Sequence, residues 1–187
     1  MPLTTIFTVT PVGSNNDAGI TYRLRCRITG GGQKIQISLK TINTGLVGHA
    51  TRVSAGIWTG SNWDISGTPV NQTLVGATGF DVTATGQTIV LDETDLGTAF
   101  TSSDDLIVCI DWAGDNNSTW TADNAANCDT GFFTTSTGGS SIAAPGAPDL
   151  GSSLTVVNAL VLIQAESAAG PALLTVPTPF GYVENEW

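Results

Sequence analysis

Three arginines at alternate positions are the residues of this sequence best suited to binding chemistry. Arg23, Arg25 and Arg27 occupy every second position of segment 22–28, and apolar side chains fill most positions between them. A period of two places the three guanidinium groups on one face of a strand. Because the planar guanidinium fork suits carboxylates and other oxyanions, this face predicts ion pairing or anion binding.

Four destinations for that arginine face remain open. It can face solvent, pair with acids of the same chain, meet an acidic surface of another copy, or bind an anionic ligand such as a sialic acid or a phosphate. All six Lys and Arg lie between positions 23 and 52, whereas 15 of the 16 Asp and Glu follow position 52. This segregation gives a contact between copies a physical basis, and the predicted product is a homo-oligomer.

The net charge of −10 bears on the classes of partner. Phosphate backbones and anionic lipid surfaces repel such a chain, so we expect no nucleic-acid partner and no membrane partner. No segment reaches the roughly 20 apolar residues of a membrane span, and the first residues lack the basic and apolar regions of a secretory signal. We therefore expect the chain to be made and used in a cytoplasm, or to leave it by lysis or assembly.

Four tryptophans, Trp58, Trp63, Trp112 and Trp120, could stack on sugar rings, and two of them predict a carbohydrate-binding surface. Trp63 and Trp120 lie near expected turns, where their rings could stack on the apolar face of a pyranose while Asn and Asp neighbours bind hydroxyls. The structural alternative is that they fill the core or an interface.

Oxygen-rich and sulfur-containing side chains raise the question of a metal. Asp111, Asp115 and Asn117 are hard ligands on a Gly-containing loop and are the calcium candidates, but their spacing does not match an EF-hand and the same residues build ordinary turns. Cys26 and Cys109 lie in apolar strand segments and are predicted to be small buried side chains. We predict no metal and no cofactor.

Catalytic signatures are lacking in the sequence. The single histidine, His49, has no recognisable nucleophile in the neighbouring sequence, and neither a GxSxG elbow nor a P-loop occurs. We predict no catalytic residue and a protein that is not an enzyme.

Strand signals recur along nearly the whole chain and must position these side chains. Segment 22–28, the glycines 30–32 and segment 35–39 together predict a hairpin, and the apolar run 105–112 predicts a central buried strand. Acids in 92–96 predict one short helical turn. Short strands separated by turn residues favour an all-β, jelly-roll-like β-sandwich. Further strands are expected at 51–58, 69–75, 79–84, 87–91, 118–122 and 154–163.

The C-terminal part of the sequence predicts two appendages to a single sandwich domain of residues 1–165. Residues 134–153 form a long small-residue loop, and residues 166–187 form an extended C-terminal arm. Phe180, Tyr182 and Trp187 in the arm are expected to dock on a neighbouring subunit as aromatic anchors.

Four segments together resemble small β-sandwich proteins encoded among tailed-phage structural genes. They are Tyr22-Arg23-Leu24-Arg25-Cys26-Arg27-Ile28, Val53-Ser54-Ala55-Gly56-Ile57-Trp58, Thr88-Ile89-Val90-Leu91-Asp92-Glu93-Thr94 and Asp105-Leu106-Ile107-Val108-Cys109-Ile110-Asp111-Trp112. The resemblance covers residues 20–122 and transfers no catalytic or ligand residue. It implies a head-decoration, spike or tail-fibre module in the virion, assembled in the host cytoplasm.

The expected function is therefore that of a virion structural protein that attaches by multivalent non-covalent contacts. Its expected partners are copies of itself and other virion proteins, such as major capsid or tail proteins. The contact residues would be Arg23, Arg25 and Arg27 together with the aromatic residues of the arm. The alternative is a carbohydrate-binding module that recognises host surface glycans through Trp63 and Trp120.

Overall fold

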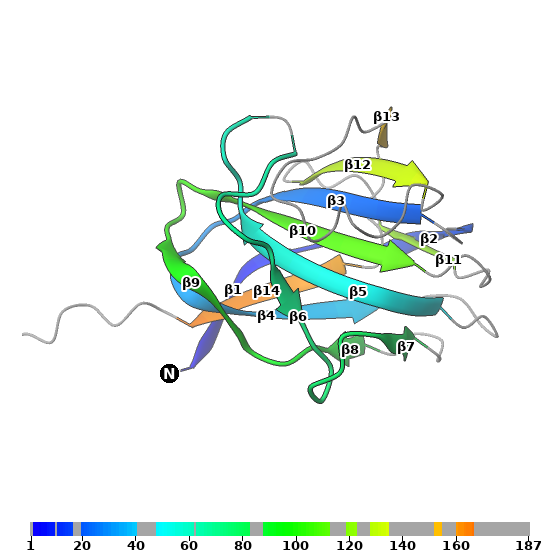
Figure 1. Cartoon of the computed structure of the whole chain (residues 1–187), viewed down its shortest axis with the longest axis horizontal. Helices are drawn as coiled ribbons and strands as arrows, with labels where there is room; N and C mark the ends of the chain where they lie inside the picture. The colour runs from blue at the N-terminus through cyan, green and yellow to red at the C-terminus, as the bar shows by residue number, and fades with distance from the viewer. Residues whose placement is uncertain are drawn as a thin grey trace, which may run out of the picture.

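Two antiparallel sheets pack face to face in the computed structural model of the chain (Figure 1). The structure describes residues 2–9, 11–16, 20–40, 48–61, 63–82, 88–112, 119–122, 128–134, 152–154 and 160–166. These residues contain strands and turns but no helix, and so no helix that could span a membrane. The predicted all-β sandwich is confirmed, whereas its jelly-roll strand order stays a prediction.

The smaller sheet has five strands in the order β1-β14-β4-β8, with β9 also pairing with β4. Inward-facing Ile35, Ile37 and Leu39 of β4 are fully buried, as its alternating sequence requires. The pairing of β1 with β14 shifts between Thr5 and Phe7, which is a bulge in the outer strand. The bounds are β1 (Leu3–Thr8), β14 (Leu160–Glu166), β4 (Gly32–Lys40), β8 (Thr88–Val90) and β9 (Thr94–Phe100).

The larger sheet has seven strands in the order β13-β12-β3-β10-β5-β6, with β7 also pairing with β5. Its bounds are β13 (Ser152–Leu154), β12 (Cys128–Thr134), β3 (Ile20–Arg27), β10 (Asp105–Trp112), β5 (Gly48–Ile57), β6 (Val70–Gln72) and β7 (Phe80–Val82). A separate ribbon pairs β2 (Pro11–Asn16) with β11 (Thr119–Ala122).

The position of strand β10 within the larger sheet explains its continuous apolar sequence. It lies between β3 and β5, and Leu106, Val108 and Ile110 face the core between the sheets. Ile107 and Cys109 face the other way and are equally buried, because Ile65 packs on them from the connection after β5. The prediction of a central buried strand at 105–112 is thus confirmed, and the outer face of this sheet is partly covered.

The predicted hairpin between 22–28 and 35–39 is wrong. β3 pairs with β10 and β12 in the larger sheet, whereas β4 belongs to the smaller one, so residues 28–31 cross between the sheets. Glycine is needed at this crossing because of crowding rather than turn geometry. A Cβ at Gly31 would lie 2.6 Å from the Phe100 carbonyl oxygen, and one at Gly32 would lie 2.3 Å from that of Glu166.

The helical turn predicted at 92–96 is also wrong. Residues 94–100 form β9, and the acids before it and at its start bind loop amides instead of capping a helix. Asp92 accepts hydrogen bonds from the backbone N–H groups of Val75 and Gly76 and from the Thr73 hydroxyl. The Asp95 carboxylate accepts one from the Gly97 N–H.

The C-terminal elements differ from expectation in part. The strand expected at 154–163 is replaced, within the described residues, by β13 at 152–154 and β14 at 160–166. Strands β1, β2, β9 and β12 had no predicted counterpart. Most of the 134–153 loop and the arm beyond residue 166 lie outside the described residues.

Candidate functional site

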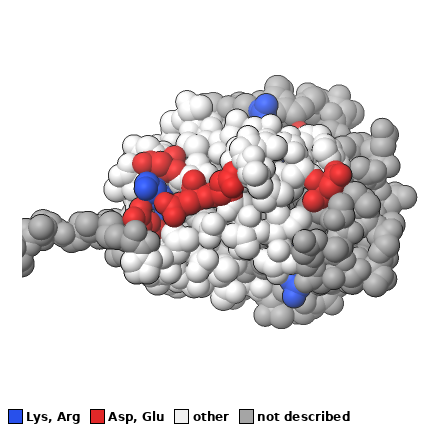
Figure 2. Space-filling view, turned by 90° about the horizontal axis from the view of Figure 1, so that it is seen from below, with Lys and Arg blue, Asp and Glu red and all other residues white. Residues whose placement is uncertain are grey.

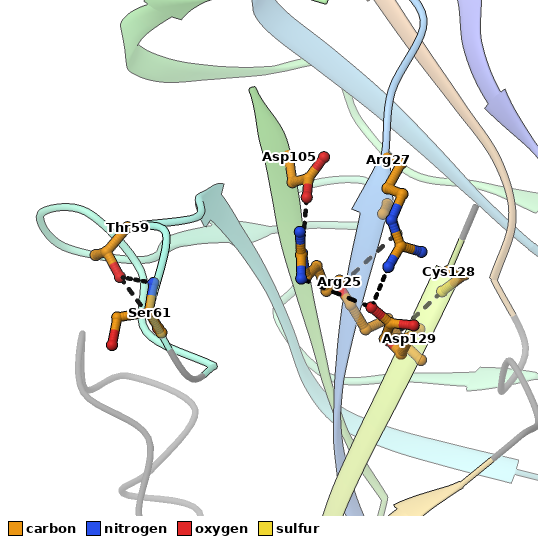
Figure 3. A network of polar contacts seen from close by, with 9 residues as sticks. Arg25, Arg27, Thr59, Ser61, Asp105, Cys128 and Asp129 are labelled. Atoms are coloured by element: carbon orange, nitrogen blue, oxygen red, sulfur yellow. Dashed lines mark hydrogen bonds and ion pairs between the residues drawn. The ribbon is translucent and has the colours of Figure 1, made fainter. Parts of the chain in front are cut away.

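The arginine row of β3 lies on the outer face of the larger sheet, flanked by acids of both neighbouring strands. In register, Arg25 stands opposite Asp129 of β12, and Arg27 stands opposite Asp105 of β10. The ion pairs run diagonally across these positions, where long side chains can meet. Arg25 Nε donates to Asp105 Oδ2 at 2.7 Å, and Arg27 Nη2 donates to Asp129 Oδ2 (Figure 3).

The two half-buried arginines, Arg25 and Arg27, are therefore matched within the chain. Arg25 also places Nη1 3.7 Å from Asp129 Oδ2, so this carboxylate serves both arginines. The side chains of Arg25 and Arg27 are 25% and 40% exposed, respectively. Of the four destinations open to this face, the described contacts show pairing with acids of the same chain.

Arg23 has a different environment from its two neighbours. Its side chain is fully buried, and Nη1 donates to the Trp63 carbonyl oxygen at 2.7 Å. This guanidinium therefore ties β3 to the connection after β5. Arg23 has no exposed surface in this structure, so only Arg25 and Arg27 of the three predicted contact arginines are accessible from outside.

A cleft of about 540 Å³ opens beside these two arginines. The Cζ atom of Arg25 lies 3.4 Å from the ring centroid of Trp58, a cation–π contact that holds both side chains at the cleft wall. Asp104 also lines the cleft, and its carboxylate accepts hydrogen bonds from the Thr101 backbone N–H and hydroxyl. Other lining residues are Arg27, Ile28, Thr59, Gly60, Ser102, Ser103 and Asp105.

The two predicted sugar-binding tryptophans, Trp63 and Trp120, lie in different parts of the fold. Trp63 is half-buried and packs on the cluster of Ile65, Ile107 and Cys109, in agreement with the structural alternative. It does not line the cleft. Trp120 lies in β11, and its side chain is outside what the structure describes. Trp58 is one of the four tryptophans able to stack on a sugar but not one of the two predicted binding residues, and it is the tryptophan at the cleft.

The described part of the calcium candidate is already hydrogen-bonded. Asp111 is 8% exposed, its Oδ1 accepts from the Thr21 hydroxyl, and its Oδ2 accepts from the Thr51 hydroxyl. Asp115 and Asn117 lie outside the described residues. Within the described ranges, no group of three or more His, Cys, Asp or Glu side chains is arranged to hold a metal ion.

The single histidine forms an exposed pair with an acid. His49 Nδ1 lies 2.6 Å from Asp81 Oδ1, between β5 and β7, and both side chains are more than a third exposed. The pair joins two strand ends and lies apart from the residues that line the cleft.

An acidic patch, formed by Asp92, Glu93, Asp95 and Glu166, lies on the outer side of the smaller sheet (Figure 2). Lys34 of β4 stands among these acids, 3.4 Å from Glu166 and 3.6 Å from Glu93. Glu166, followed by Glu93, raises the pKa of Lys34 above its ordinary value. Hydrogen bonds from the Gly97 N–H and from Gln33 lower the pKa of Asp95.

The sequence identified the arginines but not the side chains that complete their surroundings. Asp105, Asp129 and Trp58 come from positions far from β3 in the chain, so spacing alone offered no signal for them. The anchor candidates Phe180, Tyr182 and Trp187 lie outside the described residues. No family model matches this sequence, and no curated protein matches it.

Proposed function

We propose that this chain is a structural component of a bacteriophage particle, such as a capsid-decoration, spike or fibre-base protein. The observation that best supports this role is the acidic patch. The Lys34 ammonium group pairs with Glu93 and Glu166 and attracts the Asp95 carboxylate on the outer side of a sheet. The side chains of Lys34 and Glu93 are 44% and 40% exposed. A surface of this kind selects a basic partner and excludes acidic ones.

The acidic patch is a better attachment surface than the arginine row. Arg25 and Arg27 are already balanced by Asp105 and Asp129, whereas the patch has an excess of negative charge. The partner that fits it is a basic surface on another virion protein, such as a major capsid or tail protein. Repetition of one modest contact over many copies then supplies strong attachment without any reaction.

The test is charge reversal within the patch. We expect Glu93→Lys to release the chain from purified particles at lower salt than the unaltered protein, as measured by quantitative mass spectrometry of washed particles. Glu93 suits this test because it is exposed and forms a surface ion pair with Lys34. Asp81→Lys, on β7, is the matched reversal outside the patch and should be retained. Absence of the unaltered chain from particles at low salt would contradict the proposal.

A second candidate function is recognition of host surface glycans at the cleft. An indole, two arginines, carboxylates and the hydroxyls of Thr59, Ser102 and Ser103 surround it, which is a combination suited to sugar hydroxyls and ring carbons. We therefore propose Trp58, rather than Trp63, as the sugar-stacking residue of this second candidate.

A glycan array separates the two functions. Glycan binding that disappears in Ser102→Tyr, which fills the cleft from an exposed rim position, and persists in Trp63→Phe would support recognition at this site. No binding to any glycan by folded protein would reject it and would leave the particle-attachment proposal intact.

A further inference from the structure

Two cysteines distant in sequence face each other inside the sandwich. Cys26 of β3 and Cys128 of β12 are directly opposite in the antiparallel register. Both belong to the core cluster, with 0% and 2% of their surfaces exposed, so both side chains point between the sheets. None of the three cysteines of the chain is joined in a disulfide in this structure.

The separation of the two strands suits a covalent link. Directly opposite residues of an antiparallel pair have Cα atoms about 4.5 or 5.5 Å apart, depending on whether the pair is hydrogen-bonded, and disulfides span about 4.4–6.8 Å. The side chains of Cys26 and Cys128 are close enough to hydrogen-bond with each other. A disulfide here therefore needs side-chain rotation but no shift in strand register.

We propose that Cys26 and Cys128 form a cross-strand disulfide that links β3 to β12 when the protein encounters an oxidising environment. The thiolate of one cysteine attacks a low-molecular-weight disulfide, forms a mixed disulfide and releases one small thiol. The thiolate of the other cysteine then attacks the protein sulfur and releases the second small thiol. The two cysteines lose two electrons and two protons in total, and the external disulfide gains them.

Burial controls when this reaction can occur. Removal from water, followed by the neighbouring Cys128 thiol, raises the pKa of Cys26 well above its ordinary value. The folded protein therefore holds Cys26 as an unreactive thiol, and burial keeps oxidants away from Cys128 as well. Strand β12 has only the three-residue β13 on its other side, so opening at this edge exposes the pair more readily than opening at the central β10 would.

Cys109 provides a matched internal control. It is also buried, and desolvation raises its pKa to about 11. Its side chain packs with Ile65 and Ile107 on the outer face of the sheet, and its register partners are Arg23 and Ser54. With no cysteine opposite, it should remain a thiol under conditions that oxidise the pair.

The experiment refolds the full chain in a buffer of oxidised and reduced glutathione, so that burial cannot prevent equilibration. We expect thiol titration in denaturant to find one remaining thiol and peptide mapping to find Cys26 joined to Cys128. Cys109→Ala should still form the link, and Cys128→Ala should not. The cross-linked form should unfold at a higher Tm that falls to the reduced value on addition of dithiothreitol.

Two results would overturn the proposal. One is that correctly refolded protein keeps all three thiols at glutathione ratios that oxidise accessible pairs of neighbouring thiols. The other is a disulfide that includes Cys109. The double variant Cys26→Ser, Cys128→Ser serves as the baseline. Its Tm should be the same with and without dithiothreitol, because it cannot form the link.

Discussion

At the scale of single residues, shared acids determine what the arginine row can do. Asp129 accepts contacts from both Arg25 and Arg27, and Asp105 holds Arg25 from the other side. Arg25 thus has carboxylates on two strands and an indole ring against its guanidinium. A ligand or partner must compete with these internal contacts, which is why the acidic patch, with its excess of negative charge, is the attachment surface we propose.

Asp92 gives a prediction for the effect of pH on stability. The Thr73 hydroxyl, followed by the Gly76 N–H, lowers the pKa of this carboxyl below its ordinary value. Its stabilising effect is therefore complete above the unfolded-state pKa and is lost as pH falls through the lower folded-state pKa. We expect Asp92→Asn to lower Tm at neutral pH and to have a smaller effect in acid. A difference in Tm that stays constant across this range would contradict the prediction.

At the scale of elements, the connection after β5 turns an exposed sheet face into a second small core. Ile65 lies against Gly56 so closely that a Cβ at that glycine would be 2.3 Å from Ile65 Cγ2. Burial of Ile107 and Cys109 depends on this approach. The same connection supplies Trp58 and Thr59 to the cleft, so its position also sets the shape of that site.

The substitution Gly56→Ala tests this dependence. The added methyl group must displace Ile65, and overpacking of this kind costs about 1–3 kcal/mol of unfolding free energy. We expect denaturant unfolding to show that loss, together with a change in Trp fluorescence. Ala substitution at Gly60 is a less informative control because its φ of +90° adds backbone strain. The substitution Ala55→Val lies on the face of β5 that points into the main core, and it measures the cost of overpacking that core.

Local patterns predicted the strands of this protein better than their partners. The alternation in β3 and the apolar run of β10 were sufficient to locate both elements. The assignment of β3 and β4 to different sheets depends on close approaches at Gly31 and Gly32, which no local pattern reveals. For the site, the arginines were predictable, but Asp105 and Asp129 lie 80 and 102 positions from the arginines they bind.

At the scale of the whole molecule, the two outer faces of the sandwich are chemically different. The larger sheet presents balanced ion pairs beside a cleft, and the smaller sheet presents the acidic patch. If the proposed particle role is correct, these two unlike faces would let the chain contact two unlike neighbours, as at a boundary between a shell and its surroundings.

Removal of the predicted arm separates folding from attachment. The described core is formed by side chains of residues 6–165, which belong to the two sheets and their connections. We therefore expect truncation after residue 170 to preserve the circular dichroism spectrum and to leave Tm nearly unchanged, while particle occupancy falls because Phe180, Tyr182 and Trp187 are lost. Full occupancy of the truncated chain would show that these aromatic residues are not anchors, and loss of the fold would show that the arm belongs to the domain.

The margins of the two sheets limit how copies can join. β13 and β6 are three residues long, and the pairing of β1 is interrupted between Thr5 and Phe7. Short or irregular borders offer few free backbone amides and carbonyls to an incoming strand, so they protect against fibre growth by strand addition. Crowding many copies onto one particle is thus compatible with each sandwich keeping its own separate pair of sheets.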